Sequence, residues 1–511
     1  MDVVSAAVLG GVLAILVVSL SLASGRRSDL PSGPKGDFIV GNLGVLLSKY
    51  QWMKFSEWSK TFGDIMYLTV LGRPIVVLNK LEHARELMEK RSAIYSDRPR
   101  MDYIVEMVKV RSVTFMPYGD TWRLHRRLLQ QYLNPRAVLA FRPLQTRLVR
   151  DLVQDLYLEP DAFWRHIKRF AASAVLSATY GYQVERRDDP LMKLNEFSEN
   201  AVARAGPPGT TLVDLFPILQ HAPSFLPGLS FKDYALEARV ALKEMLDRPY
   251  ETVKQQRDTG TATPCLLTHM LDDYEQQGAD DKQRAEAIKE VCGSMYRAGV
   301  GTTSAVLYTF MLAMVLYPRV ARKAQDDLDA VLRGERLPTF DDQDSLPYIT
   351  CIAKECLRWG TPFPLGISHR AIEEGELEGK YIPKGSMIIP NVWQMMHDER
   401  NYNNPMEFNP DRFIAKTDDT FLSSVPDPAL AVFGFGRRIC PGRHFAEADI
   451  WLAIASILTV FDIRPAVDDK GSEILPKPEF TSGLNSWPME FMCRIIPRNK
   501  KAAVLARNAR E

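Results

Sequence analysis

The sequence predicts a mainly α-helical protein with a minor β portion, preceded by a single membrane-spanning helix. Three observations support this: helical patterns dominate the chain, strand-like stretches are few and short, and the first apolar stretch is uninterrupted. The chain has 511 residues, which is long for one domain, yet no repeat, low-complexity block or clear linker follows residue 45. We therefore expect one large folded body over residues 46–511.

The first segment has the properties of a membrane anchor. Residues 3–24 carry no charged side chain, and Arg26 and Arg27 follow directly. As a helix this stretch would be roughly 33 Å long, enough to cross a hydrocarbon core of about 30 Å. A cleaved signal peptide is the alternative, but its basic residues normally precede a shorter apolar stretch. The positive-inside rule then predicts a single-pass anchor in the endoplasmic reticulum membrane, with the folded body in the cytosol. Residues 25–45, basic and rich in proline and glycine, are expected to form a hinge.

Charge and cysteine usage exclude several classes of protein. A formal net charge of +1 gives no reason to expect a nucleic-acid partner. The six cysteines are scattered without a Cys-x-x-Cys pair, which disfavours a structural zinc site and a disulfide framework and suits a reducing compartment. They are Cys265, Cys292, Cys351, Cys356, Cys440 and Cys493.

The folded body should contain one helix of unusual length. An apolar helical pattern runs from about Gln283 to Leu316 and is stopped by Pro318. A helix of about 34 residues would span roughly 50 Å, so it must pass through the core. Short strands are expected at residues 65–71, 75–79 and 387–390.

The segment from Phe433 to Arg443 carries the chemistry. Cys440 stands just before a helix expected at residues 444–460, where the helix dipole and free backbone N–H groups favour a thiolate. A thiolate is the ligand that pushes electron density onto a haem iron. Gly436 and Gly442 would allow the backbone to approach the Cys440 sulfur and the haem ring closely. Arg438 supplies a cation suited to a haem propionate.

This segment resembles the signature of the cytochrome P-450 superfamily, Phe-x-x-Gly-x-Arg-x-Cys-x-Gly. Phe433, Gly436, Arg438, Cys440 and Gly442 fill its fixed positions. The resemblance implies the cytochrome P-450 fold, haem b bound by these residues, and Cys440 as the axial ligand of its iron. Residues 46–511 would then be a haem-thiolate catalytic domain. The alternative is a buried structural cysteine after a glycine-rich turn.

Two further groups of residues resemble parts of the same family. Glu355 and Arg358 lie three apart on one helix face, and with Arg412 they resemble the Glu-Arg-Arg cluster that locks the fold around the haem. We interpret this cluster as structural.

A second match concerns the haem propionates. The resemblance makes Trp122 and Arg126 haem contacts, whereas His125 between them could equally be a surface residue. His369 and Arg370 are further propionate candidates by the same resemblance.

The long helix contains the stretch most directly relevant to the reaction mechanism, Ala298 to Thr303. Gly299 and Gly301 each cost about 1 kcal/mol relative to alanine inside a helix, which indicates close approach or a local widening. Thr302 resembles the hydroxyl residue that helps to deliver protons to dioxygen at the haem. The family usually has an acid just before this threonine, and Gly301 stands there instead. Proton delivery then runs through water or another side chain, or the protein does not activate O2 in the ordinary way. The alternative is that the glycines only allow tight packing.

The resemblance implies a monooxygenase, most like fungal microsomal members of secondary metabolism. One atom of O2 would enter a hydrophobic small molecule such as a terpenoid. The chain has no Gly-x-Gly-x-x-Gly unit, so NADPH and flavin would act only through a separate NADPH-cytochrome P-450 reductase. Arg123, Arg127 and Arg443 could form a basic face for this partner.

Mostly apolar side chains are expected to line the substrate site. They are Ile104, Val105, Phe115, Tyr296, Val300, Phe363, Leu365, Leu484 and Trp487. Two alternatives remain. The first is a haem-thiolate isomerase or dehydratase that needs no reductase, which Gly301 favours and Thr302 disfavours. The second is a non-enzymatic protein that binds haem or an apolar ligand.

Overall fold

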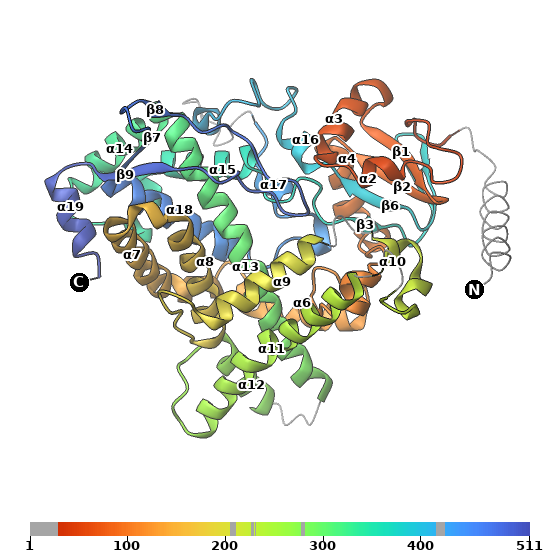
Figure 1. The fold of residues 1–511 in the computed structure, drawn as a ribbon, viewed down its shortest axis with the longest axis horizontal. Helices are drawn as coiled ribbons and strands as arrows, with labels where there is room; N and C mark the ends of the chain where they lie inside the picture. Colours follow the sequence, from red (N-terminus) through yellow and green to blue (C-terminus); the bar gives the residue numbers. More distant parts are fainter. Residues whose placement is uncertain are drawn as a thin grey trace.

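A computed structural model describes residues 29–204, 211–225, 229, 231–276, 282–414 and 425–510. The predicted anchor at residues 3–24, together with Arg26 and Arg27, lies outside the described residues. The described chain is mainly helical, as expected from the sequence (Figure 1). Its helices of eight or more residues are α3 (Gln51–Phe62), α6 (Asp120–Leu133), α7 (Arg142–Leu158), α8 (Phe163–Tyr180), α9 (Pro190–Arg204), α11 (Phe231–Asp258), α12 (Leu266–Gln276), α13 (Lys282–Leu316), α14 (Pro318–Leu332), α15 (Pro347–Trp359), α18 (Arg443–Val460) and α19 (Lys500–Arg507).

Shorter helical turns connect these elements. The short α-helices are α2 (Leu43–Leu46), α4 (Leu81–Arg85), α5 (Ser92–Tyr95), α10 (Leu212–Leu215), α16 (Val392–Met396) and α17 (Ala429–Val432). The 3₁₀ and π turns are η1 (Glu86–Lys90), η2 (Asp102–Met107), η3 (Ala137–Phe141), η4 (Pro160–Ala162), η5 (Pro217–His221), η6 (Phe340–Ser345), η7 (Pro410–Phe413) and η8 (Gly436–Arg438).

The three predicted strands are confirmed and belong to one sheet. β1 (Ile65–Val70) pairs antiparallel with β2 (Arg73–Leu78), and β2 pairs parallel with β6 (Met387–Pro390). The sheet order is β1-β2-β6-β3, with β3 at His369–Arg370. The sequence did not predict two smaller sheets, β4 (Gly375–Leu377) with β5 (Lys380–Ile382), and β8 (Glu473–Ile474), β7 (Phe461–Val467) and β9 (Cys493–Pro497).

The described part of the predicted hinge, residues 29–45, packs along the first sheet. The Tyr67 N–H donates to the Ser32 carbonyl over 3.0 Å, and the Asn42 N–H donates to the Thr69 carbonyl over 2.6 Å. This stretch therefore continues the folded body through backbone hydrogen bonds to β1.

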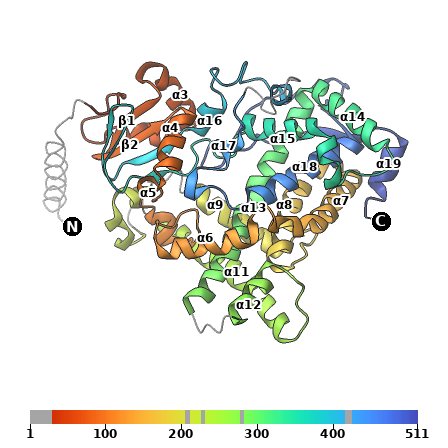
Figure 2. The same ribbon diagram turned by 180° about the vertical axis from the view of Figure 1, so that it is seen from behind.

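Helix α13 is the central element of the helical region, as its length predicts. It contacts α8, α15 and α18, and both views show it running between these helices (Figures 1 and 2). Within the described residues it is the one helix long and apolar enough to cross a membrane, but 78% of its apolar window is buried inside the protein. This burial identifies α13 as a core helix.

The apolar core changes partners halfway along α13. Residues of α13 up to Val300 belong to a cluster with α6, α8, α11 and α12. Residues from Val306 onward belong to a second cluster with α7, α14, α15 and α18. The glycine-bearing stretch from Gly299 to Thr302 lies at this boundary, which is where an interior site can open.

Candidate active site

Cys440 ends a tight loop over residues 433–440, the cysteine loop, just before α18. Its N–H donates to the Phe433 carbonyl over 2.7 Å, and the η8 turn between them closes through a hydrogen bond from the Arg438 N–H to the Phe435 carbonyl. Helix α18 begins at Arg443, close to the predicted start. Residues 439–448 are all half-buried, whereas residues 449–460 are buried, so the first turns of this interior helix border open space.

The ionisation of Cys440 is not set by the helix end alone. Burial raises the pKa of the Cys440 thiol, while the Gly442 backbone N–H and the Arg126 guanidinium act in the opposite direction. The prediction that the helix N-terminus produces a thiolate is therefore incomplete, because desolvation is the larger effect. A coordinating metal cation would remove the proton outright.

The two signature positions, 436 and 442, carry glycine for different structural reasons. Gly436 has a φ of 51°, and a Cβ there would collide with the Met88 carbonyl of η1. It is thus required for packing of the loop on η1, and close approach to the haem ring stays a prediction. A Cβ on Gly442 would meet no atom within 4 Å, so this position does border open space.

Three buried arginines converge beside the cysteine loop. Arg438 donates to the carbonyls of Ser96 and Val113 over 2.7 and 3.0 Å, and its guanidinium lies 4.4 Å from the Trp122 ring centre. Arg126 of α6 donates to the Ile439 carbonyl, next to Cys440. Arg98 donates to the carbonyls of Thr114, Ile367 and Ser368.

The positive charge of this cluster is only partly compensated, by Asp97, which acts on Arg98 and Arg438. Burial lowers the pKa of all three guanidiniums, that of Arg438 to about 10, and Arg438 further lowers the pKa of Arg98. Arg438 Nη2 and Arg126 Nε are buried without a hydrogen-bond partner. The nearby Asp97 carboxylate is already shared with Arg370. The sequence reasoning missed Arg98, because no local pattern distinguishes it from a surface arginine.

The remaining propionate candidates are placed differently from one another. The Trp122 indole N–H donates to the Val113 carbonyl over 3.1 Å, so this side chain offers its ring face to Arg438 and has no free donor. His369 is buried and its Nδ1 contacts the Tyr95 carbonyl at 2.6 Å, which leaves Nε2 available. Burial and the adjacent arginines lower the pKa of His369. His125 is buried against Glu290 of α13 at 3.3 Å, so it is neither a surface residue nor part of the arginine cluster.

One face of α13 is open in the middle of the buried helix. Ala298 is exposed, and Gly301 and Thr302 are half-buried. These positions lie three and four residues apart and share one face of the helix. The Thr302 hydroxyl donates to the Ala298 carbonyl over 2.9 Å, and its oxygen can still accept a hydrogen bond.

Tyr296 and Val300 lie on the opposite face of α13, which corrects their expected place at the site. Tyr296 is fully buried, its hydroxyl donates to the Leu191 carbonyl, and its ring packs edge-on against Tyr180. At about 100° per residue, both positions point away from Ala298. They therefore pack the core between α13 and its neighbours.

The other predicted substrate residues separate into two groups. One apolar cluster contains Ile104, Val105, Phe115, Phe363 and Leu484, and the Arg297 guanidinium lies 5.5 Å from the Phe115 ring centre. Leu365 packs with the first sheet, although it shares a small pocket with Leu484. Trp487 packs against the second core cluster, with α7, α14, α15 and α18, and not with the apolar cluster that contains Phe115.

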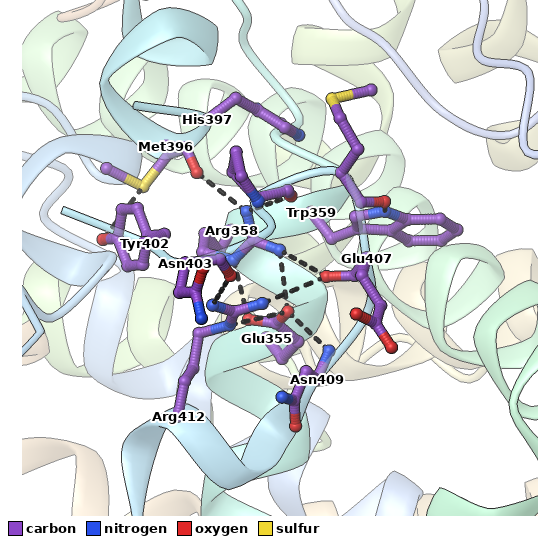
Figure 3. A network of polar contacts seen from close by, with 12 residues as sticks. Glu355, Arg358, Trp359, Met396, His397, Tyr402, Asn403, Glu407, Asn409 and Arg412 are labelled. Atoms are coloured by element: carbon purple, nitrogen blue, oxygen red, sulfur yellow. Dashed lines mark hydrogen bonds and ion pairs between the residues drawn. The ribbon is translucent and has the colours of Figure 1, made fainter. Parts of the chain in front are cut away.

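Glu355, Arg358 and Arg412 come together at the C-terminal end of α15 (Figure 3). Arg358 pairs with both Glu355 carboxylate oxygens at 2.7 Å, and Arg412 Nε lies 3.2 Å from Glu355 Oε1. Arg358 also donates to the carbonyls of Met396, Pro405 and Glu407. The cluster thus ties α15 to the segment that leads toward the cysteine loop.

Comparison with known proteins agrees with this geometry. A family model described as Cytochrome P450 matches residues 31–488. Cytochrome P450 monooxygenase 176 of Postia placenta is 39% identical over 504 residues, covering 98% of this chain and 96% of that protein. Cytochrome P450 monooxygenase claR of Ampulloclitocybe clavipes is 39% identical, covering 94% of this chain and 89% of that protein. The chain belongs to the cytochrome P450 family. Its class of enzyme is that of the P450 monooxygenases.

The family implies a haem bound through a cysteine thiolate, and the described residues fit such a group. The unpartnered nitrogens of Arg438 and Arg126 point to a missing anionic partner, as the two propionates of a haem would provide. Cys440 is reachable at the open start of α18. Among the described residues no group of three or more His, Cys, Asp or Glu side chains could hold a metal ion by itself.

Proposed function

We propose that this enzyme inserts one atom of O2 into an apolar small molecule, such as a terpenoid or another secondary metabolite, with Cys440 as the axial ligand of haem b. The observation that carries the proposal is the position of Cys440, at the open start of α18 beside buried arginines, two of which have a nitrogen without a hydrogen-bond partner. The haem, when bound, supplies the centre at which O2 is activated.

The protein side chains have separate tasks in this proposal. Arg98, Arg126 and Arg438 bind the propionates and fix the orientation of the ring. Thr302, on the open face of α13, would hold a proton at its hydroxyl oxygen for the chemistry that the haem supplies when bound. The cluster of Glu355, Arg358 and Arg412 keeps the segment before the cysteine loop in place.

Substrate selection would follow from the apolar cluster that contains Phe115, whose ring lies 5.5 Å from the Arg297 guanidinium of α13. Ile104 and Phe115 are buried there, and Val105 and Phe363 are half-buried. Such walls exclude water and bind a hydrophobic molecule without fixing its orientation by hydrogen bonds. This supports an apolar substrate class.

Electrons would come from an NADPH-cytochrome P-450 reductase, which carries the flavin. Arg123 and Arg127 are exposed on α6, and Arg443 is half-buried at the start of α18. Arg123 is paired with Asp120, so Arg127 is the more available charge for an acidic partner. Residues 3–24 would anchor the enzyme in the endoplasmic reticulum membrane, with residues 25–45 between the anchor and the catalytic domain.

The difference spectrum of the reduced protein with and without carbon monoxide tests the central claim. We expect a strongly red-shifted Soret band in the wild type, its loss in Cys440→Ser, and its retention in the control Cys351→Ala, which changes another buried cysteine. A band that persists in Cys440→Ser would overturn the ligand assignment. Product formation that continues without reductase and NADPH would instead favour the isomerase or dehydratase.

A further inference from the structure

Gly301 lies directly against a carboxylate from another helix. A Cβ at Gly301 would lie 2.7 Å from Glu199 Oε1, and Glu199 belongs to α9, which packs on α13. The Gly301 backbone N–H also stabilises the charged form of this carboxylate. A side chain at position 301 and the carboxyl group of Glu199 would therefore compete for one space, next to Thr302.

Glu199 is connected to the surface by polar groups. Its Oε1 accepts from Asn195 Nδ2 over 3.0 Å, and its Oε2 lies 3.9 Å from Lys168 Nζ. Lys168 also pairs with Glu196, whose side chain is 62% exposed. The Glu199 side chain is only 26% exposed. The carboxyl group thus stands between a solvated ion pair and the open stretch of α13.

The environment of Glu199 favours a carboxyl group that can hold a proton. Burial raises its pKa and the charge of Glu196 acts in the same direction, whereas Lys168 and Asn195 lower it. On α13, the positive charge of Arg297 interacts with Glu199, and burial lowers the pKa of Arg297 to about 10. Tyr296 and Tyr308 are the other titratable neighbours, and the charge of Glu199 raises the pKa of each.

We propose that Glu199 is the proton-relay residue of this enzyme, acting through Thr302 from the space that Gly301 leaves without a side chain. This inference rests on the proposed monooxygenase function. Each insertion consumes one O2, two electrons from NADPH and two protons, and it places one oxygen atom in the substrate and releases the other as water. Glu199 gives its carboxyl proton, through an intervening water, to the lone pair of Thr302 Oγ1, while the Thr302 hydroxyl releases its own proton at the open face of α13. Glu199 is then a carboxylate, and it regains a proton from solvent at the side of Lys168 and Glu196.

A purely structural role makes a different prediction. Glutamine has the shape of glutamate and keeps the contact with Asn195, so Glu199→Gln would be nearly silent if Glu199 only holds α9 against α13. The matched control is Glu237→Gln, the same change at an exposed position of α11, the helix that packs against α9. A rescue variant combines Glu199→Ala with Gly301→Glu, which returns a carboxylate to the same space from the other helix.

The test uses the full-chain holoenzyme with an NADPH-cytochrome P-450 reductase, and it measures NADPH-dependent O2 consumption without added substrate in H2O and D2O. We expect the rate of Glu199→Gln to fall by at least about tenfold, the scale of a lost general acid, with a larger solvent isotope effect. Glu237→Gln should match the wild type, and the rescue variant should recover most of the lost rate.

A readout independent of turnover is the infrared band of protonated carboxyl groups in the resting protein. We expect a component that disappears in Glu199→Gln and persists in Glu237→Gln. An unchanged rate and isotope effect in Glu199→Gln, or a fall that Gly301→Glu does not rescue, would overturn the relay. A wild type that keeps the carbon monoxide band but consumes no O2 with the reductase would instead overturn the proposed function.

Discussion

Glu355 and Arg358 form a two-point ion pair in a fully buried part of the molecule. Both nitrogen–oxygen distances are 2.7 Å, and both side chains have 0% exposure. Every remaining donor of the Arg358 guanidinium that the structure describes points to a backbone carbonyl of residues 396–407. The pair therefore organises a segment that has little regular structure of its own.

Removing one partner of this pair should be severely destabilising. Glu355→Ala leaves the Arg358 charge buried without a counter-charge, which we expect to lower the free energy of unfolding by about 3–5 kcal/mol. Guanidinium denaturation followed by circular dichroism measures this loss. Arg336→Ala is the control, because Arg336 makes a similar two-point pair with Asp342 but is half-exposed. Its loss should cost about 1 kcal/mol or less. Equal effects of the two variants would contradict the organising role of the buried pair.

Arg438 should determine how firmly the haem is retained. Arg438→Met removes a guanidinium that has one buried nitrogen without a hydrogen-bond partner, and a charge-assisted hydrogen bond is worth about 1.5–3 kcal/mol. Haem transfer to apomyoglobin should accelerate by roughly tenfold to a hundredfold. The neighbouring Arg437 is exposed and donates to the Tyr118 hydroxyl, so Arg437→Met should leave the transfer rate unchanged. Similar rates for Arg438→Met and the wild type would remove Arg438 from the propionate site.

Asp449 should make the stability of the fold depend on pH. Burial in α18 raises the pKa of Asp449 from 3.8 to about 8, and its Oδ1 has no hydrogen-bond partner. The folded state therefore holds a proton that the unfolded state releases at lower pH. The stabilising contribution of the protonated form is complete below the unfolded pKa and is lost as the pH rises toward about 8.

Asp449→Asn should abolish this loss. The variant should gain stability over the wild type between pH 5 and pH 8, with the largest gain at the alkaline end, because asparagine stays neutral. Denaturation midpoints across this pH range provide the measurement. Asp469→Asn changes an exposed residue, so its denaturation midpoints should show the same pH dependence as those of the wild type. A constant difference between Asp449→Asn and the wild type at all pH values would refute the buried proton.

Thr302→Ala should separate electron use from productive chemistry. The hydroxyl lies on the open face of α13, so its loss should raise the hydrogen peroxide released per NADPH by roughly severalfold. The next residue, Thr303, is buried, and Thr303→Ala should not change this ratio. Full coupling in Thr302→Ala would exclude this hydroxyl from proton transfer.

The sequence by itself determined the elements whose signals are local. The cysteine loop, the helix that follows it, the length of α13 and the strands β1, β2 and β6 each depend on a continuous pattern of residues, so their bounds could be predicted closely. The pair of Glu355 and Arg358 was also readable, because residues three apart on a helix face meet within the same element.

Only the tertiary structure decided which faces and which distant residues meet. Periodicity shows that Tyr296 and Val300 share one face of α13, but packing decides that this face is buried and that Ala298 faces open space. Arg98 joins Arg438, and Glu199 reaches Gly301, through contacts between elements far apart in the sequence. A side chain's neighbours across such distances depend on how whole helices pack, and no local pattern carries that information.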